Sequence, residues 1–104
     1  MANTILIVED DKEINSLLCK ALENYGYNAK SAFTGIQGLD MLKNEPFDML
    51  LLDIMLPYKS GDKLLQELRS FSNIPVLIIS AKETTQVKID LFQLGADDYI
   101  TKPF

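Results

Sequence analysis

Short apolar runs alternate with longer segments of helical spacing along this chain, and this alternation constrains the fold more than any other feature. Three of the runs are apolar almost throughout, which is typical of strands that are buried on both faces of a sheet. The five β-prone runs are Thr4 to Val8, Asn28 to Ala32, Met49 to Leu52, Pro75 to Ile79 and Tyr99 to Thr101. Because helical crossovers join parallel strands, the pattern predicts an α/β fold with helices on both faces of a parallel sheet.

The segments between these runs carry apolar residues at helical spacing. The clearest has six such residues before Gly26, which suits a helix C-cap; they are Ile14, Leu17, Leu18, Ala21, Leu22 and Tyr25. A helix over Thr34 to Lys43 is also expected, although Gly35 and Gly38 lower its propensity. Two more stripes follow, formed by Leu64, Leu65, Leu68 and Phe71 and by Val87, Leu91 and Leu94. Four helices are therefore predicted.

Size and composition limit what such a chain can do. With 104 residues, of which 47% are hydrophobic, it is expected to form one domain. The N-terminal residues show neither a signal peptide nor a membrane span, which favours a cytoplasmic location without a membrane partner. Cys19 is the only cysteine and histidine is absent, so chemistry would depend on carboxylates, hydroxyls, lysine and oxygen ligands. A net charge of −5 argues against binding of a nucleic-acid backbone by this chain alone.

Polar residues stand where the predicted strands end. Glu9, Asp10 and Asp11 follow the first strand, Asp53 the third, Ser80 the fourth and Lys102 the fifth. In open parallel sheets this edge is where ligands bind. Converging carboxylates need a compensating cation, and a small set of oxygen ligands favours Mg²⁺ over Ca²⁺. The pattern predicts an aspartyl-phosphate site, in which the solitary acid Asp53 is the candidate nucleophile.

Each of these residues also has a simpler structural explanation. Asp10 and Glu13 have the spacing of a capping box on the first helix. Asp53 could be a turn residue, Ser80 could be an ordinary serine at a strand end, and Lys102 could be a solvated surface lysine. The joint placement at several strand ends favours a site.

Four motifs, in this order and spacing, resemble the receiver domain of two-component response regulators, and most of all the OmpR/PhoB subfamily of transcriptional regulators. They are ILIVEDD (5–11), LLLDIMLPYKSG (50–61), PVLIISAK (75–82) and LGADDYITKPF (94–104). The resemblance covers essentially the whole chain. It implies a flavodoxin-like, doubly wound sheet of five parallel strands in the order 2-1-3-4-5, with the family's final helix missing. The chain is then expected to be a receiver, residues 1–104, of a longer regulator whose DNA-binding output domain is absent.

The resemblance implies a role for each acid. Asp53 would be the phosphoacceptor, and Mg²⁺ would be held by Glu9, Asp10, Asp53 and the backbone carbonyl of Met55. Asp11 falls one place beyond the family's acidic pair and is expected to cap the first helix.

The resemblance also implies a switch. Lys102 would pair with the phosphoryl oxygens, and its peptide bond to Pro103 would be cis. Ser80 would move toward the phosphate, and Tyr99 would turn inward into the space that Ser80 leaves. A local change of charge would thereby bias a two-state surface.

The implied partners are a sensor histidine kinase and a second copy of the chain. Phosphorylation would promote a homodimer through the face of the fourth helix and fifth strand. Ile89 and Phe92 would form its apolar patch, with Lys88, Asp97 and Asp98 around them. DNA would be bound only through the missing output domain.

Two other functional classes fit the sequence less well. A phosphohydrolase of the haloacid dehalogenase type needs a second aspartate two residues after the nucleophile, and Met55 stands there instead. A degenerate receiver that acts as an unphosphorylated binding module usually lacks an acid or the lysine, whereas this chain retains them all. The chain is therefore expected to be a regulatory phosphoacceptor that assists its own phosphorylation and dephosphorylation, and no further enzyme activity is expected.

Overall fold

The computed structural model describes residues 3–54, 56, 61–80, 93 and 95–101, and for residues 80 and 99–101 it describes the backbone alone. The elements are β1 (Thr4–Val8), α1 (Lys12–Asn24), β2 (Asn28–Ala32), α2 (Gly35–Asn44), β3 (Met49–Asp53), α3 (Gly61–Arg69), β4 (Val76–Ser80) and β5 (Asp98–Thr101). Strands and helices alternate as the sequence predicts. The apolar residues of the predicted fourth helix, Val87, Leu91 and Leu94, lie outside the described residues.

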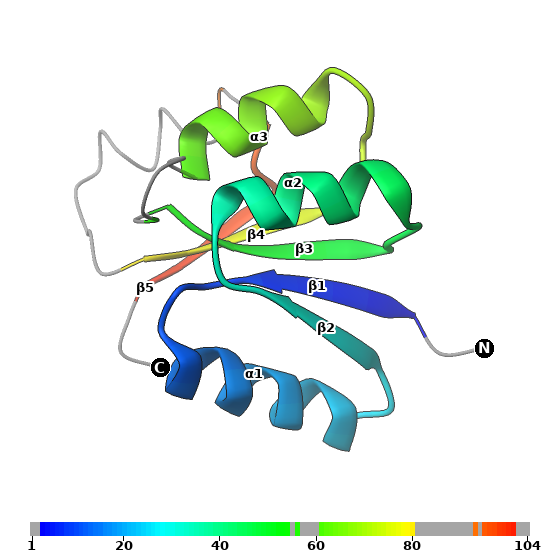
Figure 1. Ribbon diagram of the computed structural model, residues 1–104, viewed down its shortest axis with the longest axis vertical. Helices are drawn as coiled ribbons and strands as arrows, with labels where there is room; N and C mark the ends of the chain where they lie inside the picture. Colours follow the sequence, from blue (N-terminus) through cyan, green and yellow to red (C-terminus); the bar gives the residue numbers. More distant parts are fainter. Residues whose placement is uncertain (1–2, 55, 57–60, 81–92, 94, 102–104) are drawn as a thin grey trace.

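The strands form one parallel sheet in the order β2-β1-β3-β4-β5 (Figure 1). Strand β1 lies inside the sheet, where Val8 pairs with Ala32 of β2 on one side and with Leu52 of β3 on the other. The arrangement confirms the doubly wound α/β class and the predicted order of the first four strands. Strand β5 continues the sheet by pairing with β4.

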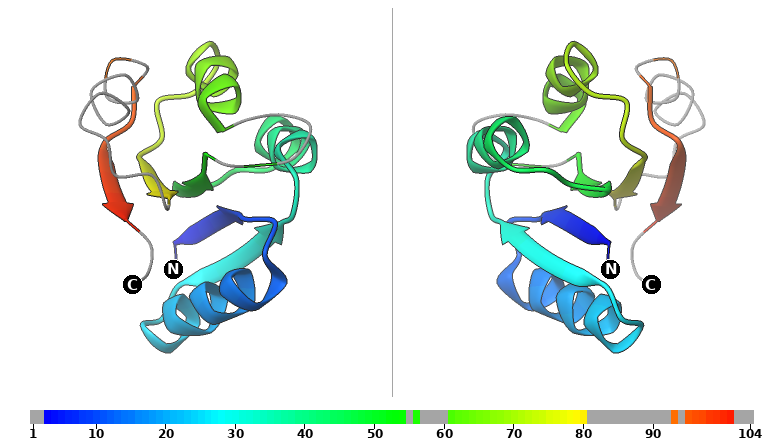
Figure 2. Two further views of the ribbon diagram at one scale, coloured as in Figure 1. Left: turned by 90° about the vertical axis from the view of Figure 1, so that its left-hand side faces the viewer. Right: turned by 90° about the vertical axis from the view of Figure 1, so that its right-hand side faces the viewer.

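Helices cover both faces of the sheet, with α1 on one face and α2 and α3 on the other (Figures 1 and 2). Alternate residues of β1 therefore enter different cores. Leu6 and Val8 belong to the larger core beneath α2 and α3, whereas Ile5 and Ile7 belong to a smaller core that includes residues of α1. Because both faces are covered, β1 is apolar throughout its buried length.

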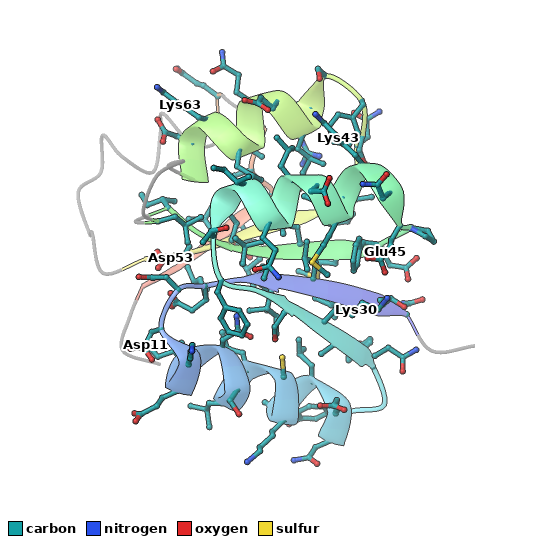
Figure 3. All side chains as sticks on the ribbon, viewed as in Figure 1. Asp11, Lys30, Lys43, Glu45, Asp53 and Lys63 are labelled. Atoms are coloured by element: carbon teal, nitrogen blue, oxygen red, sulfur yellow. The ribbon has the colours of Figure 1, made fainter. Side chains whose placement is uncertain are left out.

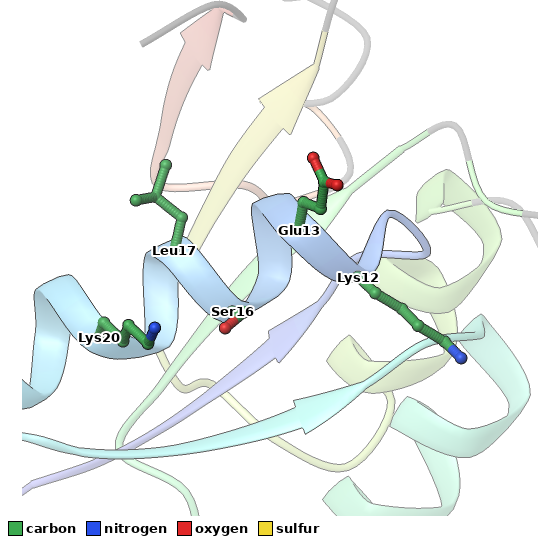
Figure 4. Close-up of a pocket in the computed structure, with 5 residues that line it drawn as sticks. All are labelled: Lys12, Glu13, Ser16, Leu17 and Lys20. Carbon is green, nitrogen blue, oxygen red and sulfur yellow. The ribbon is translucent and has the colours of Figure 1, made fainter.

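The side of α1 that packs on the sheet differs in part from the predicted stripe. Leu18, Cys19 and Leu22 pack against the smaller core, and Asn15 is fully buried. Of the other four residues of the predicted stripe, Ile14 is half-buried, and three are exposed: Leu17 (59% exposed), Ala21 and Tyr25 (83% exposed). Leu17 instead lines an open pocket together with other residues of α1 (Figure 4). The helix is rotated so that Asn15 faces the strand ends, where its amide forms hydrogen bonds.

The predicted stripe of α3 and the predicted glycine at the end of α1 can both be compared with the structure. Leu64, Leu65 and Leu68 of α3 are fully buried, as predicted. Phe71 lies beyond the last residue of α3 and is 44% exposed, so its assignment to the same stripe was wrong. At the end of α1, Gly26 has a φ of 91°, which confirms the predicted glycine terminus.

Among the described residues, no helix combines the length and apolar character needed to cross a bilayer.

Helix α2 passes close to β1, and Gly38 is the residue that allows this approach. A Cβ at Gly38 would lie 2.7 Å from Cγ2 of Val8. Val8 is fully buried, and its β-branched side chain has little rotamer freedom to move away. The glycine that weakens the helical signal of α2 therefore serves the packing of that helix on the sheet.

Overpacking a core usually costs about 1–3 kcal/mol, and the short distance to a stiff, buried side chain favours the upper part of this range. Alanine returns about 1 kcal/mol in a helix interior, so we expect Gly38→Ala to lower the free energy of unfolding by about 1–2 kcal/mol. Urea unfolding followed by circular dichroism measures the change. Adding Val8→Ala removes the opposing methyl groups, so the double variant should lose less than the sum of the two single changes. A Gly38→Ala variant as stable as the parent would contradict this account.

Candidate functional site

Three carboxylates converge where β1 and β3 end. Glu9 and Asp10 follow β1, and Asp53 is the last residue of β3. Because these strands are parallel neighbours, their ends meet at one edge of the sheet. One carboxylate oxygen from each of the three residues lies within 4.8 Å of the other two. Figure 3 shows Asp53 at the same end of the molecule as Asp11, where α1 begins.

The three carboxylates differ in exposure. Glu9 is fully buried, Asp53 is 3% exposed and Asp10 is exposed. Burying a carboxylate is costly unless a partner or a cation compensates its charge. Glu9 and Asp53 thus form the buried part of the site, and Asp10 lies on its solvent-exposed side. Three oxygen donors with room for water fit Mg²⁺, which keeps several waters in its octahedral shell.

Asp11 is adjacent in sequence but serves the helix. Its Oδ1 accepts hydrogen bonds from the backbone N–H groups of Glu13 at 2.9 Å and Ile14 at 3.2 Å. These contacts confirm Asp11, and not Asp10, as the N-cap of α1. The backbone N–H of Asp11 also donates to Oε2 of Glu9 at 3.4 Å. The start of α1 therefore contacts one of the clustered acids.

Asn15 contacts the same strand ends, although the sequence pattern did not single it out. Its side chain is fully buried, and Nδ2 donates to the backbone carbonyls of Glu9 at 3.0 Å and Ala32 at 3.2 Å. Asn15, Leu18, Cys19 and Leu22 share one helical face. A polar residue on an otherwise apolar face was the signal that could have identified it.

Gly61 allows α3 to begin directly against the end of β3. Its backbone N–H donates to the carbonyl of Ile54 at 3.0 Å. A Cβ on Gly61 would lie 2.5 Å from Cα of Ile54 and 2.7 Å from the carbonyl oxygen of Asp53. Both neighbours are backbone atoms, so a side chain here would displace the segment that carries Asp53.

We expect Gly61→Ala to lower the free energy of unfolding by about 1–3 kcal/mol and also to weaken Mg²⁺ binding, because the clash displaces backbone beside the site. Urea unfolding and isothermal titration with Mg²⁺ measure the two effects. Gly38→Ala is the matched control, since its clash involves Val8 instead of the acidic cluster. Equal Mg²⁺ affinity in the two variants would show that Gly61 matters for packing alone.

Asp97, predicted at the edge of an interface, also has contacts within the chain. Its Oδ2 accepts from the backbone N–H of Val76 at 2.8 Å and from Nη2 of Arg69 at 3.1 Å. Arg69 further donates to the carbonyls of Gly95 and Ile74. Asp97 thus joins α3 to the beginnings of β4 and β5. Asp98, the first residue of β5, is exposed.

The structure describes only part of the remaining predicted site. The backbone of Ser80 pairs with that of Thr101, so β4 and β5 end at the same edge as β3. The backbone of Tyr99 lies in β5 and pairs with Ile78. The side chains of Ser80 and Tyr99 lie outside the described part of the chain, as do Met55, Lys88, Ile89, Phe92, Lys102 and Pro103. The cluster brought together is therefore Glu9, Asp10 and Asp53.

Comparison with known proteins agrees with this geometry. Residues 5–104 match the family model for the response regulator receiver domain. Transcriptional regulatory protein CpxR of Escherichia coli is 43% identical over 102 residues, which cover 98% of this chain and 44% of that protein. Regulatory protein VanRc of Enterococcus gallinarum is 39% identical over 104 residues, which cover 100% of this chain and 45% of that protein. The chain spans less than half the length of both relatives.

A solved structure shows the same fold. The CheY-like response regulator receiver domain protein of Methanospirillum hungatei superposes with a TM-score of 0.94 at 31% identity, covering 100% of this chain and 84% of that one. The acidic triad is typical of the Mg²⁺ site of receiver domains. The motifs, the fold and the sequence matches lead to one conclusion: the chain belongs to the response regulator receiver domain family, with relatives of the OmpR/PhoB type.

Proposed function

We propose that this chain is the phosphoryl-accepting switch of a two-component transcriptional regulator, with Asp53 as the acceptor and a sensor histidine kinase as the donor. The family is one of regulatory phosphoacceptors and not of classical enzymes. The observation that carries the proposal is the convergence of Glu9, Asp10 and Asp53 at the carboxyl edge of the sheet. Ligands of doubly wound folds bind at this edge.

Asp53 is the best placed of the three acids to act as the nucleophile. It ends β3, which lies between β1 and β4, and its backbone pairs with that of Ile79 in β4. In the proposed step, a carboxylate oxygen of Asp53 attacks the phosphorus of a phosphohistidine on the kinase. The phosphorus–nitrogen bond breaks, and the imidazole leaves with the electron pair and takes up a proton. The histidine belongs to the partner, which agrees with its absence from this sequence.

Glu9, Asp10 and Asp53, with the backbone carbonyl of Met55, are proposed to hold Mg²⁺. The described oxygen donors, three carboxylates of which one is exposed, fit this ion. When bound, Mg²⁺ supplies positive charge that offsets the negative charge of the carboxylates and of the transferring phosphoryl group. Asp10 is the exposed member and offers an approach from solvent.

The readout is proposed to use the ends of β4 and β5. Ser80 and Thr101 are paired in the backbone, and Lys102 follows Thr101 in sequence. Lys102 is proposed to pair with the phosphoryl oxygens, while Ser80 and Tyr99 change position as the switch. This proposal is supported by the shared edge of β3, β4 and β5.

The output is proposed to be dimerisation of phosphorylated chains in the cytoplasm. Its surface would comprise Lys88, Ile89, Phe92, Asp97 and Asp98. DNA would be bound by an output domain of a longer protein, as the printed names of the transcriptional relatives suggest. The internal contacts of Asp97 do not prevent a role at the surface, because its side chain is 57% exposed.

Intact-mass spectrometry tests the phosphoacceptor proposal. The protein is incubated with acetyl phosphate, with and without Mg²⁺, and free phosphate is measured in parallel. A switch gains one phosphoryl group only when Mg²⁺ is present. Continuous phosphate release without any adduct would instead indicate a phosphohydrolase. An unmodified protein under all conditions would indicate a binding module, and either result would overturn the proposal.

A further inference from the structure

We infer that Asn15 is a positioning residue for the acidic site and sets Mg²⁺ affinity through the peptide unit between Glu9 and Asp10. This inference rests on the proposed function and adds a residue to its machinery. Asn15 lies in the first half of α1, and none of its side chain is exposed. It is the only described residue whose side-chain amide contacts the ends of both β1 and β2.

The nitrogen and the oxygen of the Asn15 side-chain amide have different hydrogen-bond partners. Nδ2 faces backbone carbonyls, which only accept hydrogen bonds, so the nitrogen must be on that side. It contacts the carbonyl oxygens of Glu9 at 3.0 Å, Ala32 at 3.2 Å and Ile7 at 3.5 Å. Oδ1 faces donors, and it accepts from Oγ of Ser31 and from Sγ of Cys19 at 3.5 Å. The nitrogen therefore contacts backbone at the strand ends next to the acidic site, whereas the oxygen contacts the side chains of Ser31 and Cys19.

The contact with Glu9 matters because a peptide unit is planar. The carbonyl of Glu9 belongs to the same rigid unit as the backbone nitrogen and Cα of Asp10. Fixing that carbonyl therefore fixes the position from which the Asp10 side chain projects. On the other side of Glu9, its N–H donates to the carbonyl of Ala32 at 3.1 Å. Both backbone polar groups of Glu9 are thus held, one by β2 and the other by Asn15.

The point at which the pairing of β1 with β2 ends explains why a side chain is needed here. The register of the two strands ends with Val8 opposite Ala32. Beyond this point β1 leads into α1 and β2 leads into α2, so the backbones separate. Asn15 bonds to a carbonyl of each strand across this separation. Without Nδ2, the carbonyl of Glu9 would lose a buried hydrogen bond, which is costly, whereas the carbonyl of Ala32 would keep the bond that it accepts from the N–H of Glu9.

Mg²⁺ binding to variants of the intact chain tests the inference, with isothermal titration as the readout. We expect Asn15→Ala to weaken Mg²⁺ binding about tenfold, as removal of residues behind metal ligands typically does. The apparent Mg²⁺ constant for phosphorylation by acetyl phosphate should rise by the same factor. The rate at saturating Mg²⁺ should change little, because Asn15 contacts neither Asp53 nor the phosphodonor.

The double variant Cys19→Ala with Ser31→Ala is the matched control. It removes the partners of Oδ1 and disturbs the same network, but it keeps Nδ2 and its contact with Glu9. We expect lower stability in urea and a Mg²⁺ affinity close to that of the parent. If this control weakens Mg²⁺ binding as much as Asn15→Ala does, or if Asn15→Ala binds Mg²⁺ like the parent, the inference is overturned.

Folding and function can be separated in this experiment. If Asn15→Ala does not fold, Asn15→Ser takes its place, because a serine hydroxyl can bond within the helix and leaves less buried polarity unsatisfied. Failure of the proposed function would appear in the parent, as a lack of Mg²⁺-dependent phosphorylation. Failure of the role of Asn15 would appear as a parent that is phosphorylated and an Asn15 variant with the same Mg²⁺ dependence.

Discussion

Replacing Asp53 with asparagine is expected to abolish the stable gain of one phosphoryl group from acetyl phosphate. The amide is a poor nucleophile, and no other acid of the cluster ends a strand in the interior of the sheet. The same change removes one of three carboxylates whose oxygens lie within 4.8 Å of one another. Since like charges in one site repel one another, Asp53→Asn should also raise the melting temperature when Mg²⁺ is absent.

Asp11→Asn is the control for this variant. It makes the same chemical change at the neighbouring N-cap, and asparagine caps a helix about as well as aspartate does. Phosphorylation and stability should both be retained. Intact mass and thermal unfolding, measured for the parent and both variants, give a direct comparison. A stable adduct on Asp53→Asn, at the level of the parent, would assign the phosphate to a different residue.

The second large effect concerns Mg²⁺ and Asp10. For the parent, Mg²⁺ at about ten times its dissociation constant should stabilise the fold by about 1.4 kcal/mol. For a domain of this size that corresponds to a rise in melting temperature of roughly 6–11 °C. Asp10→Asn removes the exposed ligand, so most of this rise should be lost. Thermal unfolding at increasing Mg²⁺ concentration measures the effect.

Asp11→Asn again separates charge from coordination. It lowers the negative charge near the site by the same amount as Asp10→Asn, but Asp11 points its carboxylate at the N-terminus of α1. The Mg²⁺-dependent rise should therefore persist in this variant. If both variants lose it equally, general electrostatic attraction accounts for Mg²⁺ binding, and Asp10 is not a ligand. Urea with EDTA provides the reference stability without metal.

Much of the fold could be predicted because β1 and β3 are apolar on both faces, which requires helices on both sides. The convergence of Glu9, Asp10 and Asp53 followed from the parallel arrangement alone. These features depend on residue order and on local pattern. The family was also predicted from the motifs, and the sequence matches confirm it. The expected roles of the individual residues come from that family and not from the local pattern.

The orientation of α1 could not be predicted in the same way. Leu17 and Leu18 are equally apolar, and helical spacing cannot tell which of them faces the sheet. In the structure Leu18 packs on the sheet and Asn15 contacts Glu9 and Ala32, and these contacts exist only after β1 and β2 have paired. Gly38 and Gly61 present the same difficulty, because their neighbours are distant in sequence or lie around a turn. The orientation of α1 and the need for glycine at positions 38 and 61 thus depend on tertiary contacts, which local helix propensity does not contain.

The hydrogen bonds of Arg69 have a consequence for local opening of the sheet. One guanidinium group bonds to the carbonyls of Ser72, Ile74 and Gly95 and to the carboxylate of Asp97. Asp97 and Val76 also exchange hydrogen bonds at the beginning of β4. Opening of β5 from this end must therefore break contacts to α3 as well as to β4. The start of β5 and the end of α3 should behave as one cooperative unit in hydrogen exchange, held far from the acidic edge.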